Sequence, residues 1–271
     1  MTTTLASRPR AARGARLAVG DGLAAAERLL TKLRHDPAAI TLTLGAPVVL
    51  VIIFGYIFGS AITVPGGGYR AYLIPGLFAT IAVNIVPSMF TMARDSSRGV
   101  VDRFRSLPIA RTAVPFGQAA ATLVYSLATF VLMALCGLAV GWRIERGAGL
   151  AAAALALLVA FQFAATWVGM YLGLVLGSEQ AAGQASILIY PVTILSNVYV
   201  PTSGMPAWLR AIADWNPISA LAAAIRDLSG SPAAPTNGTW QLEHPVPATL
   251  AWTALLLAIF VPLCTRRFAR S

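Results

Sequence analysis

Charged residues are scarce in this chain. Asp, Glu, Lys and Arg make up 11% of its 271 residues and hydrophobic residues 57%, whereas a soluble domain carries about 25% charged residues. Runs without acidic or basic side chains are each long enough for the roughly 20 residues that cross a bilayer as a helix. They cover residues 37–69, 71–93, 112–142, 147–178, 180–209 and 245–265. The composition excludes an ordinary soluble domain and predicts an all-α integral membrane protein.

The chain contains a single lysine, and its sequence context excludes a Walker A loop for binding ATP. A Walker A loop needs Gly-Lys followed by Ser or Thr, whereas Lys32 follows Thr31 and precedes Leu33. The chain therefore cannot hold ATP in a P-loop of its own. Its two histidines, His35 and His244, lie outside the apolar runs, so an intramembrane serine protease would lack its buried base.

Ionisable residues are also missing from the interiors of the apolar runs. Proton-coupled carriers usually keep ionisable relays inside the membrane, so an ion-driven carrier is disfavoured. The acidic residues are scattered, which disfavours an enzyme that binds a magnesium diphosphate. Cys136 and Cys264 are expected about a membrane thickness apart, too far for a disulfide within one chain. We expect no catalytic site and no metal site here.

Six spanning helices are expected, near residues 39–60, 72–93, 113–141, 150–177, 184–202 and 247–265. Basic residues at the ends of spans are retained on the cytoplasmic side. With both termini inside, fifteen of the twenty Lys and Arg residues are cytoplasmic, and the reverse topology leaves only five there. Topology and anionic lipids thus account for the net charge of +10, so a nucleic-acid partner is not expected.

The parts of the chain outside the spans have distinct compositions. Leu23, Leu30 and Leu33 recur at helical spacing opposite charged residues, which predicts an amphipathic helix on the membrane lipids. The expected order is a disordered cytoplasmic tail (1–19), this interfacial helix (20–36), one transmembrane domain (37–265) and a cytoplasmic tail (266–271). Within the domain, residues 203–228 predict two short re-entrant helices on the extracellular side, opened by Pro206 and Asn216-Pro217.

The densest charge cluster lies between the second and third expected spans. Residues 94–111 contain five arginines and two aspartates. Leaving these seven charges in hydrocarbon would cost on the order of 20 kcal/mol, at roughly 2.5 to 3.5 kcal/mol each. Residues 94–110 are therefore expected to form a short cytoplasmic helix joined to a span at each end, with Phe104 and Leu107 on its apolar face. The alternative is a solvated loop whose charges only keep it inside.

Together these features resemble the membrane subunit of a type-2 ATP-binding-cassette exporter. The segment Asp95-x-x-x-Gly99-x-x-Asp102-Arg103-x-Arg105-Ser106-Leu107-Pro108, with Arg111, is similar to that of the daunorubicin-resistance branch of drug-export permeases. The stretches Met205-Pro206-x-Trp208-Leu209-Arg210, Asn216-Pro217 and Ala224-x-Arg226 are similar to the family's extracellular re-entrant segment. The resemblance covers about residues 20–265, although many members carry Glu where Asp95 stands.

The resemblance implies partners and a role for the charged segment. Two identical or homologous permeases would sit on two separately encoded ATPase subunits, which hold ATP and Mg²⁺, so no cofactor is expected on this chain. Residues 94–110 would be the coupling helix that contacts the ATPase. Its expected contact residues are Arg94, Asp95, Arg98, Gly99, Asp102, Arg103, Phe104, Arg105 and Leu107.

The family also points to the second and fifth helices, which meet at the subunit interface, as the substrate path. The uncharged candidates there are Phe78, Asn84, Met89, Tyr190 and Asn197. Ordinary interhelical packing is an equally open role for each of them. An uncharged path suits an apolar or amphipathic cargo and handles a free multivalent anion poorly.

These expectations define a function. We expect a multi-pass bacterial cell-membrane permease that exports a hydrophobic or amphipathic drug, antibiotic or lipid-like molecule, powered by a separate ATPase. A polysaccharide or glycolipid exporter remains an alternative of the same class. An ATP-independent carrier or scaffold is the alternative of a different class, and co-purification of an ATPase would separate it from the others.

Overall fold

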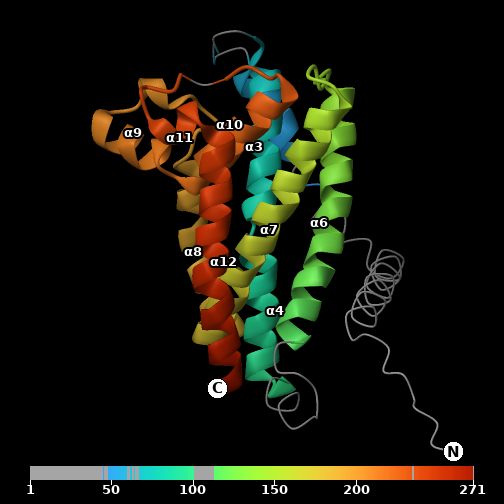
Figure 1. Ribbon diagram of the computed structural model, residues 1–271, viewed down its shortest axis with the longest axis vertical. Coiled ribbons are helices and arrows are strands. Elements are labelled where there is room, and N and C mark those ends of the chain that lie inside the picture. The colour runs from blue at the N-terminus through green and yellow to red at the C-terminus, as the bar shows by residue number, and fades with distance from the viewer. Residues whose placement is uncertain are drawn as a thin grey trace, which may run out of the picture.

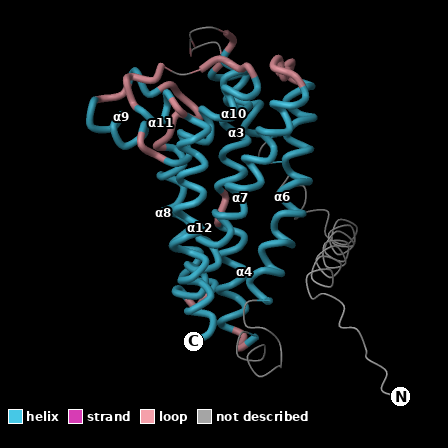
Figure 2. Tube along the Cα trace, viewed as in Figure 1, coloured by secondary structure: helices cyan, strands magenta, loops and turns pink. Residues whose placement is uncertain are grey.

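A computed structural model describes residues 45, 48–59, 62, 64, 67–100, 113–233 and 235–270. The expected tail (1–19), the interfacial helix (20–36) and residues 101–112 lie outside these ranges. Within the described ranges the regular structure is helical, apart from one isolated bridge between Val64 and Gly67 (Figure 2). Long helices run side by side, and several short ones gather at one end (Figure 1).

The described elements follow one another along the chain as a series of helices. In order they are η1 (Ile53–Phe58), α3 (Tyr69–Val83), α4 (Val86–Ser97), α6 (Ala113–Ala139), α7 (Ala148–Leu176), α8 (Glu179–Ile194), η2 (Thr202–Gly204), α9 (Ala207–Asp214), α10 (Pro217–Ser229), α11 (Trp240–Glu243) and α12 (Pro245–Arg270). We call the end that carries α9, α10 and α11 the cap end. The opposite end, where α4 and α12 finish, is the base end (Figure 1).

Four helical segments are long and apolar enough to cross a membrane. They are Tyr69–Ser97, Pro115–Ala139, Ala148–Leu176 and Pro245–Phe268. They correspond to the second, third, fourth and sixth spans expected from the sequence. The first expected span is described only in part, with a shorter apolar helix at Val48–Ile57. In place of the fifth, the 16-residue helix α8 begins and ends earlier than the expected range of 184–202.

The second span differs from the single helix that its hydropathy predicts. It is divided into α3 and α4, because Asn84 takes an extended conformation with ψ of 95°. Pro87 lies in the first turn of α4, where its missing N–H costs nothing, whereas inside one continuous helix it would break a backbone hydrogen bond. Gln162 of α7 lies at the break, and with its amide oriented so that the nitrogen faces the chain of α3, it donates to the Ile81 and Ala82 carbonyls at 2.9 and 3.1 Å.

Helix α7 is the centre of the bundle and packs against α3, α4, α6, α10 and α12. Its glycines allow α4 to approach closely. A Cβ atom at Gly173 would lie 2.9 Å from the Met92 Cβ and 3.0 Å from the Ala93 nitrogen, and one at Gly169 would lie 2.5 Å from the Ile85 carbonyl oxygen. The Gly169-x-x-x-Gly173 pattern therefore sets the spacing between these two helices.

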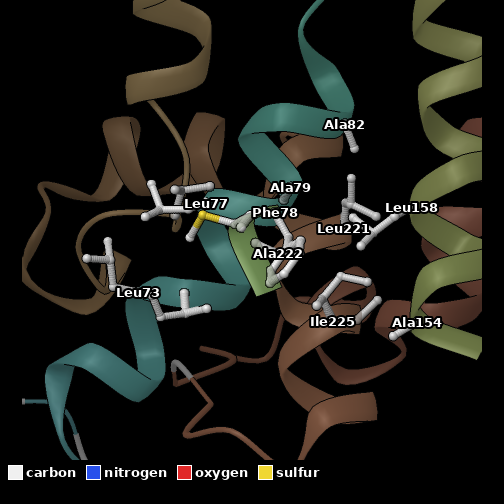
Figure 3. Close-up of a cluster of buried hydrophobic side chains, with 14 of the residues drawn as sticks. Leu73, Leu77, Phe78, Ala79, Ala82, Ala154, Leu158, Leu221, Ala222 and Ile225 are labelled. Atoms are coloured by element: carbon white, nitrogen blue, oxygen red, sulfur yellow. The ribbon is translucent and has the colours of Figure 1, made fainter. Parts of the chain in front are cut away.

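The main apolar core lies toward the cap end, between α3, α7 and α10. Figure 3 shows Phe78 of α3 among Leu221, Ala222 and Ile225 of α10, with Leu158 of α7 beside them. Side chains from three segments far apart in the sequence thus meet here. This core fixes α10, one of the short helices at the cap end, against the long helices.

Candidate functional site

Two arginines at the base end of α4 hold the first residue of α8. Arg94 donates from Nε and Nη2 to the two carboxylate oxygens of Glu179, at 3.0 and 3.1 Å. Arg98 lies one turn further along, and its Nη2 is 3.7 Å from Glu179 Oε1. Residues four apart share a helix face, so both guanidinium groups reach the same carboxylate. These three charges join the end of the second span to the start of α8.

Other residues of the predicted coupling segment are described only at its beginning. Arg94 and Asp95 belong to α4 itself, so the charged segment starts inside the helix and not after it. Gly99 has a φ of +66°, in the left-handed region that glycine adopts most easily, and the chain turns there. The remaining expected contact residues, Asp102, Arg103, Phe104, Arg105 and Leu107, lie outside the described residues, and their role stays a prediction.

Glu179 was not among the site residues that sequence reasoning selected, although a signal for it existed. It is the single charge between the runs 147–178 and 180–209. It follows Ser178, whose hydroxyl caps α8 by accepting from the Ala181 N–H at 3.2 Å. The hydrogen bond from Arg94 lowers the pKa of Glu179. The carboxylate is therefore ionised at physiological pH, and the pair is lost only as the pH falls through that lowered value.

Helix α8 is weakly embedded in the protomer. Ala182 is its only buried residue, and it packs with Met89 and Ala93 of α4. The apolar side chains nearer the cap end are exposed: Ile187, Leu188, Tyr190, Val192 and Ile194. The cap-end half of α8 therefore presents an uncharged surface that the rest of the described chain leaves uncovered.

The five expected substrate-path residues divide into two groups. Phe78, Met89 and Asn197 are buried inside the described protomer, at 6%, 0% and 0% exposure. Asn84 is exposed at the break between α3 and α4, where its Oδ1 accepts from the Val86 N–H at 3.3 Å. Tyr190 is 63% exposed on α8. Only Asn84 and Tyr190 therefore lie on the surface of the described protomer, and the path itself stays a prediction.

Asn197 instead belongs to a buried polar centre built around Arg226 of α10, which is 0% exposed. Arg226 donates to the Tyr72 carbonyl at 3.0 Å, to Asn197 Oδ1 at 3.1 Å, and to the Asn197 and Val198 carbonyls at 3.0 and 3.1 Å. Its guanidinium carbon lies 3.7 Å from the centre of the Tyr72 ring. One side chain thus ties α10 to α3 and to the turn after α8.

Comparison with known proteins decides the family. A model of the ABC-2 type transporter family matches residues 23–228, more than half of the chain. The chain belongs to the ABC-2 type transporter family. This confirms the resemblance inferred from the sequence.

Relatives of this ABC-2 transporter chain act in drug resistance. The daunorubicin resistance ABC transporter permease protein DrrB1 of Streptomyces coeruleorubidus is 29% identical over 245 residues, which cover 89% of this chain and 83% of DrrB1. The probable doxorubicin resistance ABC transporter permease protein DrrC of Mycobacterium tuberculosis is 26% identical over 274 residues, which cover 94% and 91%. With four helices able to span a membrane, this ABC-2 chain is a multi-pass protein of a bacterial cell membrane.

Asn216 fastens the cap end of α8 in this ABC-2 chain. Its Oδ1 caps α10 by accepting from the Ile218 N–H at 2.9 Å. Its Nδ2 donates to the Val192 and Leu195 carbonyls at 2.8 and 2.7 Å. These two acceptors mark the point where α8 ends, which is why the helix stops before the range that hydropathy predicts.

We expect Asn216→Ser to lower the free energy of unfolding by about 1 to 3 kcal/mol, because serine keeps the helix cap but leaves the α8 carbonyls without their amide donor. Thermal unfolding of the purified protein in detergent measures the change. Asn84→Ser is the matched control, since Asn84 is exposed and its oxygen also bonds a backbone N–H two residues on. Equal melting temperatures for the two variants would contradict the role of the Asn216 amide.

Proposed function

We propose that this chain is the membrane permease subunit of an ATP-driven exporter of hydrophobic or amphipathic drug, antibiotic or lipid-like molecules. The observation that carries the proposal is the ABC-2 family match over residues 23–228. The drug-resistance relatives support the substrate class. The uncharged, exposed cap-end half of α8 also suits such a cargo, because a charged molecule would find no compensating group there.

ATP is hydrolysed on a partner in this proposal, and the permease itself is not catalytic. Lys32 is the only lysine and does not stand in a Walker A sequence, so ATP and Mg²⁺ are assigned to an ATP-binding-cassette ATPase. We propose two ATPase subunits and a second permease, identical or homologous. Each permease spans the membrane six times, with Val48–Ile57 and α8 belonging to the two spans beyond the four long helices.

The proposed orientation places the base end in the cytoplasm. Fifteen of the twenty Lys and Arg residues lie before the first expected span, in residues 94–111 or after the sixth span, and basic residues near the ends of spans are retained inside. The charged segment after α4 then faces the ATPase, and the cap end with α9 and α10 faces outward. Residues Asp102, Arg103, Phe104 and Arg105 are the proposed contact surface.

Charge reversal of Asp102 and Arg105 tests the partner. The double variant Asp102→Arg, Arg105→Glu is expected to lose most of the co-purifying ATPase and most of the cargo-stimulated ATP hydrolysis, because charge-assisted contacts are turned into repulsions. Recovery of ATPase by affinity purification and hydrolysis with daunorubicin as the probe measure both effects.

The matched control reverses a pair at the cap end, Arg146→Asp with Asp227→Arg, whose atoms lie 2.7 Å apart in the native protein. This control is expected to retain the ATPase. Wild-type recovery and stimulation in the Asp102, Arg105 variant would overturn the proposed contact surface. A wild-type permease that transports cargo with no ATPase bound would overturn the proposed function itself.

A further inference from the structure

Helix α8 is fastened at its two ends and loosely held between them. Its only buried residue is Ala182, in the first turns. At the base end, Glu179 is held by Arg94 and Arg98. At the cap end, Asn216 binds the last carbonyls of the helix, and Arg226 binds the turn that follows. Movement of either end would therefore change the tilt of α8.

The two fastenings differ in strength. The cap-end contacts are buried, and Arg226 and Asn197 are fully enclosed. The base-end contacts are solvent-accessible, with side-chain exposures of 50% for Arg94, 66% for Arg98 and 39% for Glu179. Exposed ion pairs contribute little to stability, so the importance of the base-end contact lies in what it connects. It connects α8 to Arg94 and Arg98, the first two arginines of the charged segment.

We propose that Glu179 is a positioning residue of transport, which transmits displacement of the charged segment at the end of α4 to α8. This inference rests on the proposed function, since it requires an ATPase that moves that segment. Arg94 and Arg98 thereby acquire a different role from the one their sequence suggests. Their guanidinium groups hold α8 within the permease, and the ATPase contact is left to the residues further along the segment.

The bidentate geometry supports this assignment. Nε and Nη2 of Arg94 meet both oxygens of Glu179, an arrangement that fixes direction as well as distance. On the cap-end side of the ion pair, Met89 and Ala93 of α4 pack against Ala182 of α8. Movement of the end of α4 is therefore transmitted to α8 both by these apolar contacts and by the ion pair. Removing the charges weakens the transmission, while the apolar packing remains.

The test compares Glu179→Gln with the wild type in the full permease–ATPase complex reconstituted in vesicles. The readout is the number of daunorubicin molecules exported per ATP hydrolysed. This ratio is expected to fall at least about fivefold, the lower end of usual coupling between sites. The swapped variant Glu179→Arg, Arg94→Glu restores one pair with reversed sign but leaves Arg98 facing the new arginine, so it is expected to recover part of the ratio. A merely structural role would lower export and ATP hydrolysis together and leave their ratio unchanged.

Asp227→Asn is the matched control. It removes the negative charge from an ion pair at the cap end, between Arg146 and Asp227, with similar exposures of 51% and 47%. Its export ratio is expected to equal that of the wild type. If Glu179→Gln does not fold, the double variant Arg94→Gln, Arg98→Gln removes the same connection from the α4 side and should give the same fall.

The outcomes separate the two proposals. A wild-type export ratio in Glu179→Gln or in the double arginine variant, with ATPase bound, overturns the role of Glu179 and leaves the proposed function standing. A fall in the ratio for Asp227→Asn of the same size also overturns it, because the effect would then be general to ion pairs. Absence of any ATPase in the wild-type complex overturns the proposed function instead.

Discussion

Replacement of Arg226 by methionine is expected to lower the free energy of unfolding by about 3 kcal/mol, which corresponds to roughly 6 to 12 °C in melting temperature for a chain of this size. Methionine fills much of the volume but donates no hydrogen bond. The Tyr72 and Val198 carbonyls and Asn197 Oδ1 lose the donor that Arg226 provides, and each buried acceptor left alone costs about 1 to 3 kcal/mol.

Two effects partly offset this loss of folding stability in Arg226→Met. Burial of a guanidinium is itself expensive, so its removal returns part of the cost. The Asn197 carbonyl keeps a second donor, the hydroxyl of Tyr72. The remaining acceptors stay buried whichever residue replaces Arg226, and for that reason we expect the net change to be destabilising.

Thermal unfolding of purified protein in detergent measures the prediction. Arg143→Met is the control, because Arg143 is exposed at the same end of the bundle, and its melting temperature should stay close to that of the wild type. Arg226→Lys should fall between the two, since an ammonium group lacks the planar fork that reaches several carbonyls at once. A wild-type melting temperature for Arg226→Met would contradict the burial of this side chain.

Gly173→Val is the second substitution with a large expected effect, a loss of about 3 kcal/mol or more in the free energy of unfolding. The new side chain would meet the Met89 carbonyl oxygen, the Met92 Cβ and the Ala93 nitrogen. Two of these three are backbone atoms, which cannot rotate away as the end of a side chain can. Overpacking of this kind costs about 1 to 3 kcal/mol and sometimes more, because α4 must move off α7.

Gly149→Val is the control within the same helix. A Cβ atom at Gly149 would meet nothing within 4 Å, and valine is a better helix former than glycine. Its stability should equal or slightly exceed that of the wild type. Yield of monodisperse protein by fluorescence-detected size exclusion, followed by thermal unfolding, gives the comparison. Equal behaviour of the two valine variants would mean that α4 and α7 are further apart than described.

Much of the fold follows from composition alone, because hydropathy dictates where long helices cross a membrane. Four of the expected spans are present as helices of sufficient length. The break at Asn84 could not be predicted from hydropathy, since it depends on the backbone conformation of Asn84 and on Gln162 of a distant helix, whose amide in its satisfied orientation faces the Ile81 and Ala82 carbonyls. The end of α8 likewise depends on Asn216, which lies beyond the helix in the sequence.

The site was predictable to a lesser degree. Arginine density marked residues 94–111 as a charged segment, because seven charges cannot remain in hydrocarbon. The partner of Arg94 could not be inferred, since it is the first residue of another helix and only the packing of α4 on α8 brings the two together. Asn197 was expected on the substrate path because the family points to the fifth helix and its side chain is polar, and the contact of its oxygen with Arg226 of α10 could not be inferred.

The divided second span has a mechanical consequence. Bending a continuous helix requires backbone hydrogen bonds to stretch or break, whereas at Asn84 and Ile85 the regular pattern is already interrupted. The half formed by α3 is clamped to α10 through Tyr72 and Arg226. The half formed by α4 packs closely on α7, so a change in the angle between the two halves would carry α7 with α4 and need not stretch the hydrogen bonds within either half.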